Sequence, residues 1–295
     1  MGAPPARAQA AGLPSSVLAR AMGTGGFMTI WRSESAPVTY ADGGAPLRGT
    51  PIGGALPAGI ALEQVRLRGS GEAHWTDVVV LRMAPGAVRL ALDTAFDHGR
   101  RNWTIARAPR GALAAVNAGQ FEADLPWGWV RLDGRDFLPA GRGPLVSTLA
   151  IDSAGRLSLT HGGSAPPVQA RWGFQSYPTL LVRGTVPLAL RSAGLGLDVA
   201  HRDARLAIGT RSDGTVVVAM TRFAGLGRGL GVLPFGLTTP EMAAVMGLLG
   251  VREAVLLDGG ISAQLVVQPA SGRASSWPGL RSVPLALVAY PADAR

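Results

Sequence analysis

Apolar residues in this chain fall mostly into short runs, and most of these runs are bounded by Gly, Pro, Asp or Ser. Short runs rich in valine, leucine and isoleucine between turn residues are typical of β-strands. The positions expected to form strands are 78–81, 88–92, 112–116, 146–151, 157–160, 179–182, 207–209, 215–220, 254–257, 265–267 and 283–289. The pattern therefore predicts a β-rich protein with many turns.

Three turn sequences lie between neighbouring runs and predict how those runs connect. Ala84-Pro85-Gly86 has the form of a hairpin turn. The sequences at 152–155 and 211–214, Asp-Ser-Ala-Gly and Arg-Ser-Asp-Gly, contain the residues that favour tight turns. We expect each turn to join two antiparallel neighbours.

One segment, residues 236–250, has clear helical periodicity. Its apolar residues recur at the spacing i, i+3, i+4 and i+7, at Met242, Val245, Met246 and Leu249. Thr238 and Glu241 have the spacing of a capping box, which favours a helix start, and Gly250 is typical of a helix end. We expect a helix whose apolar stripe packs in the core, and a shorter helix over residues 104–109.

The first 60 residues are rich in Gly and Pro and show little periodicity, so we interpret 1–60 as an extended arm or linker before a compact domain at 61–295. Ala8-Gln9-Ala10 has the small-residue form of a signal-peptidase site, but no apolar stretch precedes it. The start of the chain is therefore either the remnant of a leader or an ordinary alanine-rich terminus. No apolar run reaches the roughly 18 residues of a membrane span.

Composition and charge narrow the possible functions. With 47% hydrophobic and 16% charged residues the chain is expected to fold, and the absence of cysteine excludes disulfides, thiol nucleophiles and thiolate metal sites. All 28 basic residues are arginine and the formal net charge is +9, which suits an anionic partner. The arginines are scattered without interleaved aromatic residues, so we expect no nucleic-acid partner. The four histidines lack ligand spacing, and no metal or cofactor is expected.

Three of the expected strands lie next to polar, glycine-rich turns, where backbone amides and side chains converge on ligands. Asn117 ends the first of these strands, Arg205 opens the second, and Asp258 ends the third before two glycines and Ser262. Singly, each also has an ordinary role as a turn residue, a cap or half of an ion pair. Together they predict one ligand site.

As an ordered set, five motifs resemble the phosphodiester glycosidase domain family over about residues 60–291. They are VNAGQF at 116–121, QSYPTLLVRG at 175–184, RLAIGTRSDG at 205–214, the helix at 236–250 leading into AVLLDGG, and RSVPLALVAYP at 281–291. The resemblance implies an α+β fold whose core is a large mixed, mostly antiparallel β-sheet with a few packed helices. It also implies hydrolysis of the anomeric carbon–oxygen bond of a sugar-1-phosphodiester.

The resemblance implies roles for individual residues. Asp258 is expected to be the nucleophile or base, Glu122 the other carboxylate, Arg205 the phosphate clamp and Asn117 an orienting group. The residues expected to bind substrate are Gly119, Phe121, Gln175, Gly259, Gly260, Ser262 and Arg281.

Two positions depart from the pattern that the family usually shows. Ala118 stands where Asn-Gly-Gly-Phe-Phe has its first glycine, and Ile261 stands where Asp-Gly-Gly-Gly-Ser has its third. We expect both side chains to lie beside the pocket. The competing hypothesis is a non-catalytic glycan-binding or exopolysaccharide-associated protein on the same fold, in which Trp127 and Trp129 could stack on sugar.

The family includes bacterial proteins of the envelope and of exopolysaccharide systems. The resemblance therefore implies an anionic carbohydrate or sugar-phosphate substrate in a cell-envelope or extracellular glycopolymer. It also implies a periplasmic or secreted location.

Overall fold

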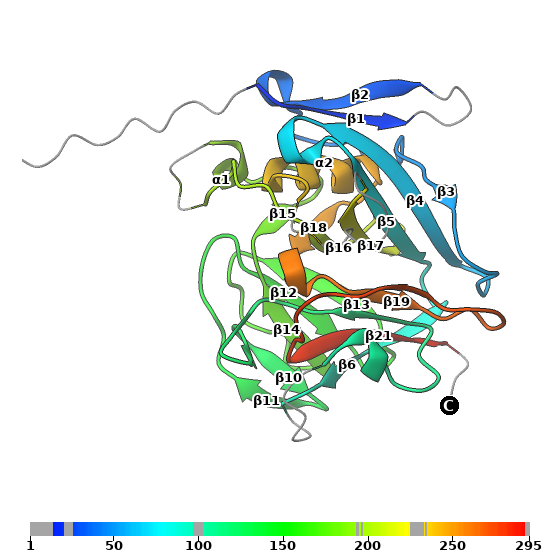
Figure 1. Ribbon diagram of the computed structural model, residues 1–295. Coiled ribbons are helices and arrows are strands. Elements are labelled where there is room, and N and C mark those ends of the chain that lie inside the picture. Colours follow the sequence, from blue (N-terminus) through cyan, green and yellow to red (C-terminus); the bar gives the residue numbers. More distant parts are fainter. Residues whose placement is uncertain are drawn as a thin grey trace, which may run out of the picture.

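The computed structural model describes residues 14–20, 26–96, 103–192, 195, 197–224, 233 and 235–292. The described strands form three larger sheets and a two-stranded ribbon, and every pairing among them is antiparallel (Figure 1). The expected α+β class with mostly antiparallel sheets and few helices is confirmed.

The largest sheet has nine strands. In spatial order they are β15 (Thr179–Leu181), β18 (Glu253–Leu256), β16 (Leu206–Thr210), β17 (Val216–Phe223), β5 (Thr76–Met83), β4 (Ile60–Gly69), β1 (Ser16–Arg20) and β2 (Phe27–Arg32), with β3 (Thr50–Pro51) paired to β4.

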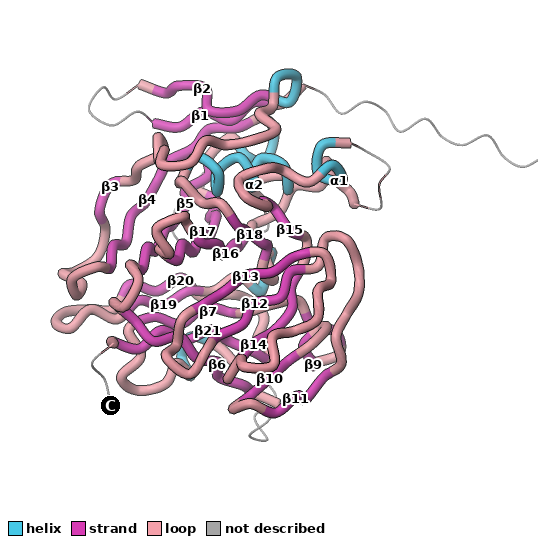
Figure 2. Tube along the Cα trace, turned by 180° about the vertical axis from the view of Figure 1, so that it is seen from behind, coloured by secondary structure: helices cyan, strands magenta, loops and turns pink. Residues whose placement is uncertain are grey.

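Two five-stranded sheets and a short ribbon complete the strand arrangement (Figure 2). One sheet has the order β11 (Arg135–Leu138), β10 (Val130–Leu132), β14 (Trp172–Ser176), β12 (Ser147–Ile151) and β13 (Leu157–His161). The other has the order β20 (Ser275–Trp277), β19 (Leu265–Val267), β7 (Ala114–Asn117), β21 (Leu285–Pro291) and β6 (Val88–Thr94). The ribbon consists of β8 (Phe121–Glu122) and β9 (Leu125–Pro126).

The nine-stranded sheet lies between a helix and the two smaller sheets. Successive apolar side chains of β17 point alternately to its two faces. Val217 and Ala219 pack into the apolar cluster that contains helix α2 (Thr239–Leu248). Val216, Val218 and Met220 point the other way, into the cluster shared with the smaller sheets. Because successive strand residues face opposite sides, a sheet covered on both faces is apolar at every position.

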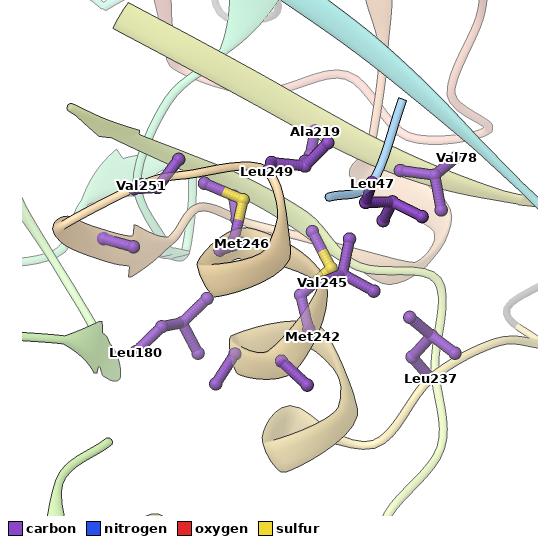
Figure 3. Packing of buried hydrophobic residues seen from close by; sticks show 14 of the residues in the cluster. Leu47, Val78, Leu180, Ala219, Leu237, Met242, Val245, Met246, Leu249 and Val251 are labelled. Carbon is purple, nitrogen blue, oxygen red and sulfur yellow. The ribbon is translucent and has the colours of Figure 1, made fainter. Parts of the chain in front are cut away.

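Helix α2 is the helix predicted at 236–250, and its predicted capping box is present. The Thr238 side chain accepts from the Glu241 backbone N–H, and the Glu241 carboxylate accepts from the Thr238 backbone N–H over 2.9 Å. Figure 3 shows Met242, Val245 and Met246 packed among apolar side chains of the surrounding strands and loops. The helix is buried nearly all round rather than along one stripe, because β1 and β2 cover it from above (Figure 1).

A second helix, α1 (Leu188–Arg191), is a single turn. Within the residues that the structure describes, short 3-10 helices cover Ser33–Ser35, Gly71–Ala73, Ile105–Arg107 and Gly260–Ser262. The helix expected over 104–109 is therefore only the 3-10 turn Ile105–Arg107. None of the helices in the described part of the chain is long and apolar enough to cross a membrane.

The segment expected to be an extended arm differs from that expectation where the structure describes it. Residues 16–20 and 27–32 form β1 and β2 at the end of the nine-stranded sheet, and β1 pairs with β4. Val17 and Ala19 are buried in the cluster around α2. The β1 run is too short and too close to glycines to stand out in the sequence, and pairing with β2 and β4 stabilises it. The possible leader motif Ala8-Gln9-Ala10 lies outside the described residues.

The hairpin predicted at Ala84-Pro85-Gly86 is wrong. The turn forms, with the Ala87 N–H donating to the Ala84 carbonyl over 3.1 Å, but β5 enters the nine-stranded sheet and β6 enters a five-stranded sheet. The turn therefore passes the chain between layers. The turns at 152–155 and 211–214 do join antiparallel neighbours, β12 with β13 and β16 with β17.

Candidate active site

A cavity of about 330 Å³ opens at the edge of the nine-stranded sheet where β18 ends. Antiparallel pairing places the end of β18 beside the starts of β15 and β16, with Leu256 opposite Ala207. The loop after β18 and the loops before β15 and β16 therefore meet there. The lining residues are Gln120, Tyr177, Pro178, Leu197, Asp198, His201, Asp203, Arg205, Thr239, Leu256, Leu257, Asp258 and Gly259.

Asp258 follows β18 and lines the cavity, where burial raises the pKa of its carboxyl group. A hydrogen bond with Ser262 and the positive charge of Arg281 oppose this rise, and the negative charge of Asp203 adds to it. The Asp258 backbone N–H donates to the Ala118 carbonyl over 3.0 Å. The carboxyl group is thus fixed in place and binds a proton more tightly than a free aspartate.

Asn117 ends β7 and lies behind the cavity wall, with no exposed surface. Its Nδ2 donates to the Asp258 backbone carbonyl over 2.7 Å, and its Oδ1 accepts from the Gln264 backbone N–H over 2.9 Å. Asn117 therefore meets Asp258, as expected, but it holds the backbone of that loop and does not line the cavity.

Arg205 lines the cavity immediately before β16, and its side chain binds two backbone carbonyls. Nε donates to Leu237 over 2.9 Å, and a terminal nitrogen donates to His201 over 2.6 Å. Burial lowers the pKa of the guanidinium group, and the charge of Asp203 opposes that change. Arg205 therefore joins the loop before β16 to the segment before α2 and brings a positive charge to the cavity.

Two lining residues that the sequence interpretation did not select, His201 and Asp203, add titratable groups. His201 Nε2 lies 3.9 Å from Asp203 Oδ2, and their side chains are 62% and 25% exposed. Because the charge of Asp203 raises the pKa of Asp258, the two carboxyl groups interact across the cavity. Their position directly before the Arg205 motif is the sequence signal that could have identified them.

Glycines allow the cavity loops to approach closely. A Cβ at Gly259 would lie 2.5 Å from a backbone carbonyl of the loop before β16, and one at Gly260 would lie 3.0 Å from Asp203 Oδ2. Gly260 also has a φ of +57°, which favours glycine. A Cβ at Gly119 would lie 2.5 Å from the Gln175 carbonyl. These three glycines therefore serve backbone packing around the site.

The side chain of Gln175 supports a neighbouring loop. It is buried, and its Oε1 accepts from the Trp129 backbone N–H over 3.0 Å and from the Gly141 backbone N–H over 2.7 Å. Gln175 does not line the cavity. Its contacts instead fix the turn that carries Gly141.

The remaining residues selected from the sequence differ in whether they interact with the Asp258 carboxyl group. Ser262 is buried and bonds to the Asp258 carboxyl group. The Arg281 guanidinium lies 4.5 Å from the centre of the Phe121 ring, and its charge reaches Asp258. Glu122 is exposed on β8 and does not line the cavity.

The two positions that depart from the family pattern do not line the cavity. Ala118 is buried in the apolar cluster shared by the three sheets, and Ile261 is 42% exposed on the 3-10 helix after Gly259. Trp129 is also buried, so it presents no surface for stacking, whereas Trp127 is half-buried near Tyr177.

The cavity therefore combines carboxyl groups, an imidazole, a half-buried arginine and an aromatic ring, which are groups that glycoside hydrolysis and phosphate binding use. Among the described residues, no three His, Asp or Glu side chains are grouped closely enough to hold a metal ion. The family model described as phosphodiester glycosidase matches residues 110–290, more than half of the chain. The chain belongs to the phosphodiester glycosidase family.

One solved structure supports the same fold. The catalytic domain of zebrafish N-acetylglucosamine-1-phosphodiester alpha-N-acetylglucosaminidase, auto-inhibited by its pro-peptide, aligns with a TM-score of 0.59 and 17% identity over 86% of this chain and 89% of that chain. A hypothetical protein from Synechocystis aligns with a TM-score of 0.46 and 15% identity, over 79% of this chain and 62% of that chain. A protein from Burkholderia pseudomallei K96243 aligns with a TM-score of 0.49 and 18% identity, over 76% of this chain and 77% of that chain. No curated protein matches this chain significantly.

Proposed function

We propose that this protein hydrolyses the bond between the anomeric carbon and the phosphate oxygen of a sugar-1-phosphodiester. The observation that carries this proposal is that Asp258 and Asp203 line one cavity together with Arg205. Glycoside hydrolysis uses two carboxyl groups that flank the scissile bond, and guanidinium groups favour phosphate. Membership of the phosphodiester glycosidase family supports the same reaction class.

The reaction consumes one water molecule. Its oxygen ends on the anomeric carbon, and the electron pair of the broken carbon–oxygen bond leaves with the phosphate as a phosphomonoester. Because phosphate is already a good leaving group, no strong general acid is required. Asp258 is the reactive carboxylate, as nucleophile or base, and Ser262 and Asn117 hold it in position.

We assign the second carboxylate to Asp203. Glu122 was the candidate from the sequence, but its side chain is exposed outside the lining, whereas Asp203 lines the cavity and its charge acts on Asp258. Arg205 supplies positive charge where the phosphate would lie, and Arg281, outside the lining, adds a second positive charge that acts on Asp258.

We further propose that the substrate is an anionic carbohydrate or sugar phosphate in a cell-envelope or extracellular glycopolymer, with the protein in the periplasm or secreted. The formal charge of +9, carried entirely by arginine, supports an anionic polymer as partner, and we propose no nucleic-acid partner. The resemblance to envelope-associated family members supports the location.

The test is release of free sugar from a panel of sugar-1-phosphodiesters, such as the methyl phosphate esters at C1 of N-acetylglucosamine and of glucose. We expect Asp258→Asn to lower kcat by about 10²- to 10⁴-fold, because the amide keeps the shape of the carboxylate and loses its charge. Asp203→Asn is expected to lower kcat as well.

Asp133→Asn is the matched control, since Asp133 is 66% exposed and pairs with Arg171 on the surface. Its kcat should equal that of the wild type. A wild-type protein that binds these ligands by calorimetry but releases no free sugar would instead be a glycan-binding protein, and the proposed hydrolysis would be wrong.

A further inference from the structure

Part of the cavity lining is apolar and aromatic, in contrast to the charged loops around Asp258. Tyr177 and Pro178 from the loop before β15 contribute this part, together with Leu197. Tyr177 is 37% exposed, so part of its surface is accessible to a ligand. A sugar 1-phosphate likewise has an apolar part and a charged part, because its ring has apolar C–H faces and its phosphate is charged.

The side chain of Gln120, another lining residue, holds the backbone of Tyr177 in place. Its Nε2 donates to the Tyr177 carbonyl over 2.6 Å, and its Oε1 accepts from the Tyr177 backbone N–H over 3.1 Å. The same Oε1 accepts from the Ser176 hydroxyl over 2.9 Å. One amide side chain thus binds both backbone polar groups of Tyr177.

Gln120 also fixes the residue against which the Tyr177 ring rests. The Trp127 backbone N–H donates to the Gln120 carbonyl over 2.8 Å. The Trp127 and Tyr177 rings form an edge-on pair with centroids 4.7 Å apart. Trp127 is itself confined, because a Cβ at Gly141 would lie 2.7 Å from its Cη2. The Tyr177 ring is therefore fixed before any ligand arrives.

We propose that Tyr177 is the sugar-binding platform of this cavity and determines specificity for the sugar ring, and that Gln120 and Trp127 are its positioning residues. This inference rests on the proposed function, since it names the part of the site that contacts the sugar. A rigid aromatic ring in a cavity contributes affinity at little entropic cost. The charged loops bind the phosphate, and the aromatic loop binds the ring.

The experiment is calorimetric titration with N-acetylglucosamine 1-phosphate, glucose 1-phosphate and inorganic phosphate. We expect Tyr177→Ala to lower the affinity for both sugar phosphates about tenfold and to leave the affinity for inorganic phosphate unchanged. Tyr177→Leu, which keeps apolar volume without a ring, should behave like Tyr177→Ala and guards against misfolding. Tyr177→Phe should retain the wild-type affinities.

Phe137→Ala is the matched control. Phe137 is 40% exposed and forms an edge-on pair with Phe96, but it lies on β11 and does not line the cavity. All three affinities of this variant should equal those of the wild type. Gln120→Ala should raise KM for a sugar-1-phosphodiester more than it lowers kcat, and Gln120→Glu, which keeps the acceptor atoms, should recover part of the loss.

Two results would overturn the platform. In the first, the Tyr177→Ala and Tyr177→Leu variants bind both sugar phosphates as tightly as the wild type does. In the second, these variants lose as much affinity for inorganic phosphate as for the sugar phosphates. If the wild type releases free sugar while these variants keep its KM, the platform is wrong and the proposed hydrolysis stands. If the wild type binds sugar phosphates through Tyr177 without releasing sugar, the platform stands and the hydrolysis is wrong.

Discussion

Two clusters at opposite ends of β18 each contain a histidine and a carboxylate, yet they differ in what they can do. At the cavity end, His201 and Asp203 lie 3.9 Å apart and are partly exposed. At the other end, Glu253 Oε2 lies 2.8 Å from His161 Nε2, and His161 Nδ1 lies 2.7 Å from the Ser147 hydroxyl. The second cluster has the distances of a hydrolytic triad.

The hydrogen bonds of this second cluster leave no capacity for a substrate. Thr179 Oγ1 donates to the Leu145 carbonyl over 2.9 Å, so it accepts from Ser147 at 2.8 Å. Ser147 then has no proton left for His161 Nδ1, and Glu253 occupies the other ring nitrogen. Ser147 also has no exposed surface.

The comparison shows that spacing between a histidine, a hydroxyl and a carboxylate does not define a catalytic site. The buried cluster joins β12, β13, β15 and β18, and thus links a five-stranded sheet to the nine-stranded sheet. At the cavity end the His201 side chain is 62% exposed, whereas that of His161 is 12% exposed. Access to the imidazole therefore distinguishes the two clusters, and a reacting group needs such access.

The largest expected effect contrasts carboxylates at the two ends of β18. Asp258→Asn should lower turnover of a sugar-1-phosphodiester by about 10²-fold or more, whereas Glu253→Gln should keep turnover close to the wild type. Steady-state kinetics on both purified variants measure this difference. Equal loss in both would mean that the buried cluster participates in catalysis.

The buried cluster should matter for stability instead. His161→Leu removes one hydrogen-bond partner from Ser147 and one from Glu253, which costs about 1–3 kcal/mol of unfolding free energy. Urea denaturation followed by circular dichroism measures the loss. His201→Leu at the exposed cavity end is the control and should leave the unfolding midpoint unchanged; a comparable loss there would break the comparison.

Arg205 is expected to affect both phosphate binding and stability, because it lines the cavity and also binds the Leu237 and His201 carbonyls. Arg205→Lys keeps the charge but loses the planar fork, so we expect a loss of about 1 kcal/mol in stability. Binding of inorganic phosphate should weaken in the same variant. Calorimetry that shows wild-type phosphate affinity would assign Arg205 to loop positioning alone.

The smallest effect concerns the pH dependence of stability at Asp258. Burial raises the pKa of this carboxyl group in the folded chain, so the folded chain binds the proton more tightly than the unfolded chain. Stability should therefore fall as pH rises from the unfolded to the folded pKa, and stay lower above it.

Asp258→Asn removes this penalty. The variant should melt at a higher temperature than the wild type at neutral pH, and the difference should vanish below the pKa of free aspartate. Thermal melts across this range measure the effect. A variant that is less stable than the wild type at neutral pH would show that the hydrogen bond of Asp258 with Ser262 and the charge of Arg281 outweigh burial.

The hydrophobic pattern by itself determined the strands that carry apolar runs and the helix α2. Every run expected to form a strand does so, and the capping box at Thr238 and Glu241 is present. These features depend on residues near one another in the chain. Strands such as β4 and β14 were missed, because charged or polar residues such as Arg66 and Gln175 interrupt their apolar pattern.

The motifs also determined the family, and they marked Asp258 and Arg205, which line the cavity. Only the tertiary structure brought His201, Asp203 and Tyr177 beside Asp258, because antiparallel pairing of β15, β16 and β18 places three distant loops at one edge. Register between distant strands depends on packing across both faces of the sheet, which no local pattern records. For the same reason Asn117, Gln175 and Glu122, selected from local motifs, lie outside the cavity lining.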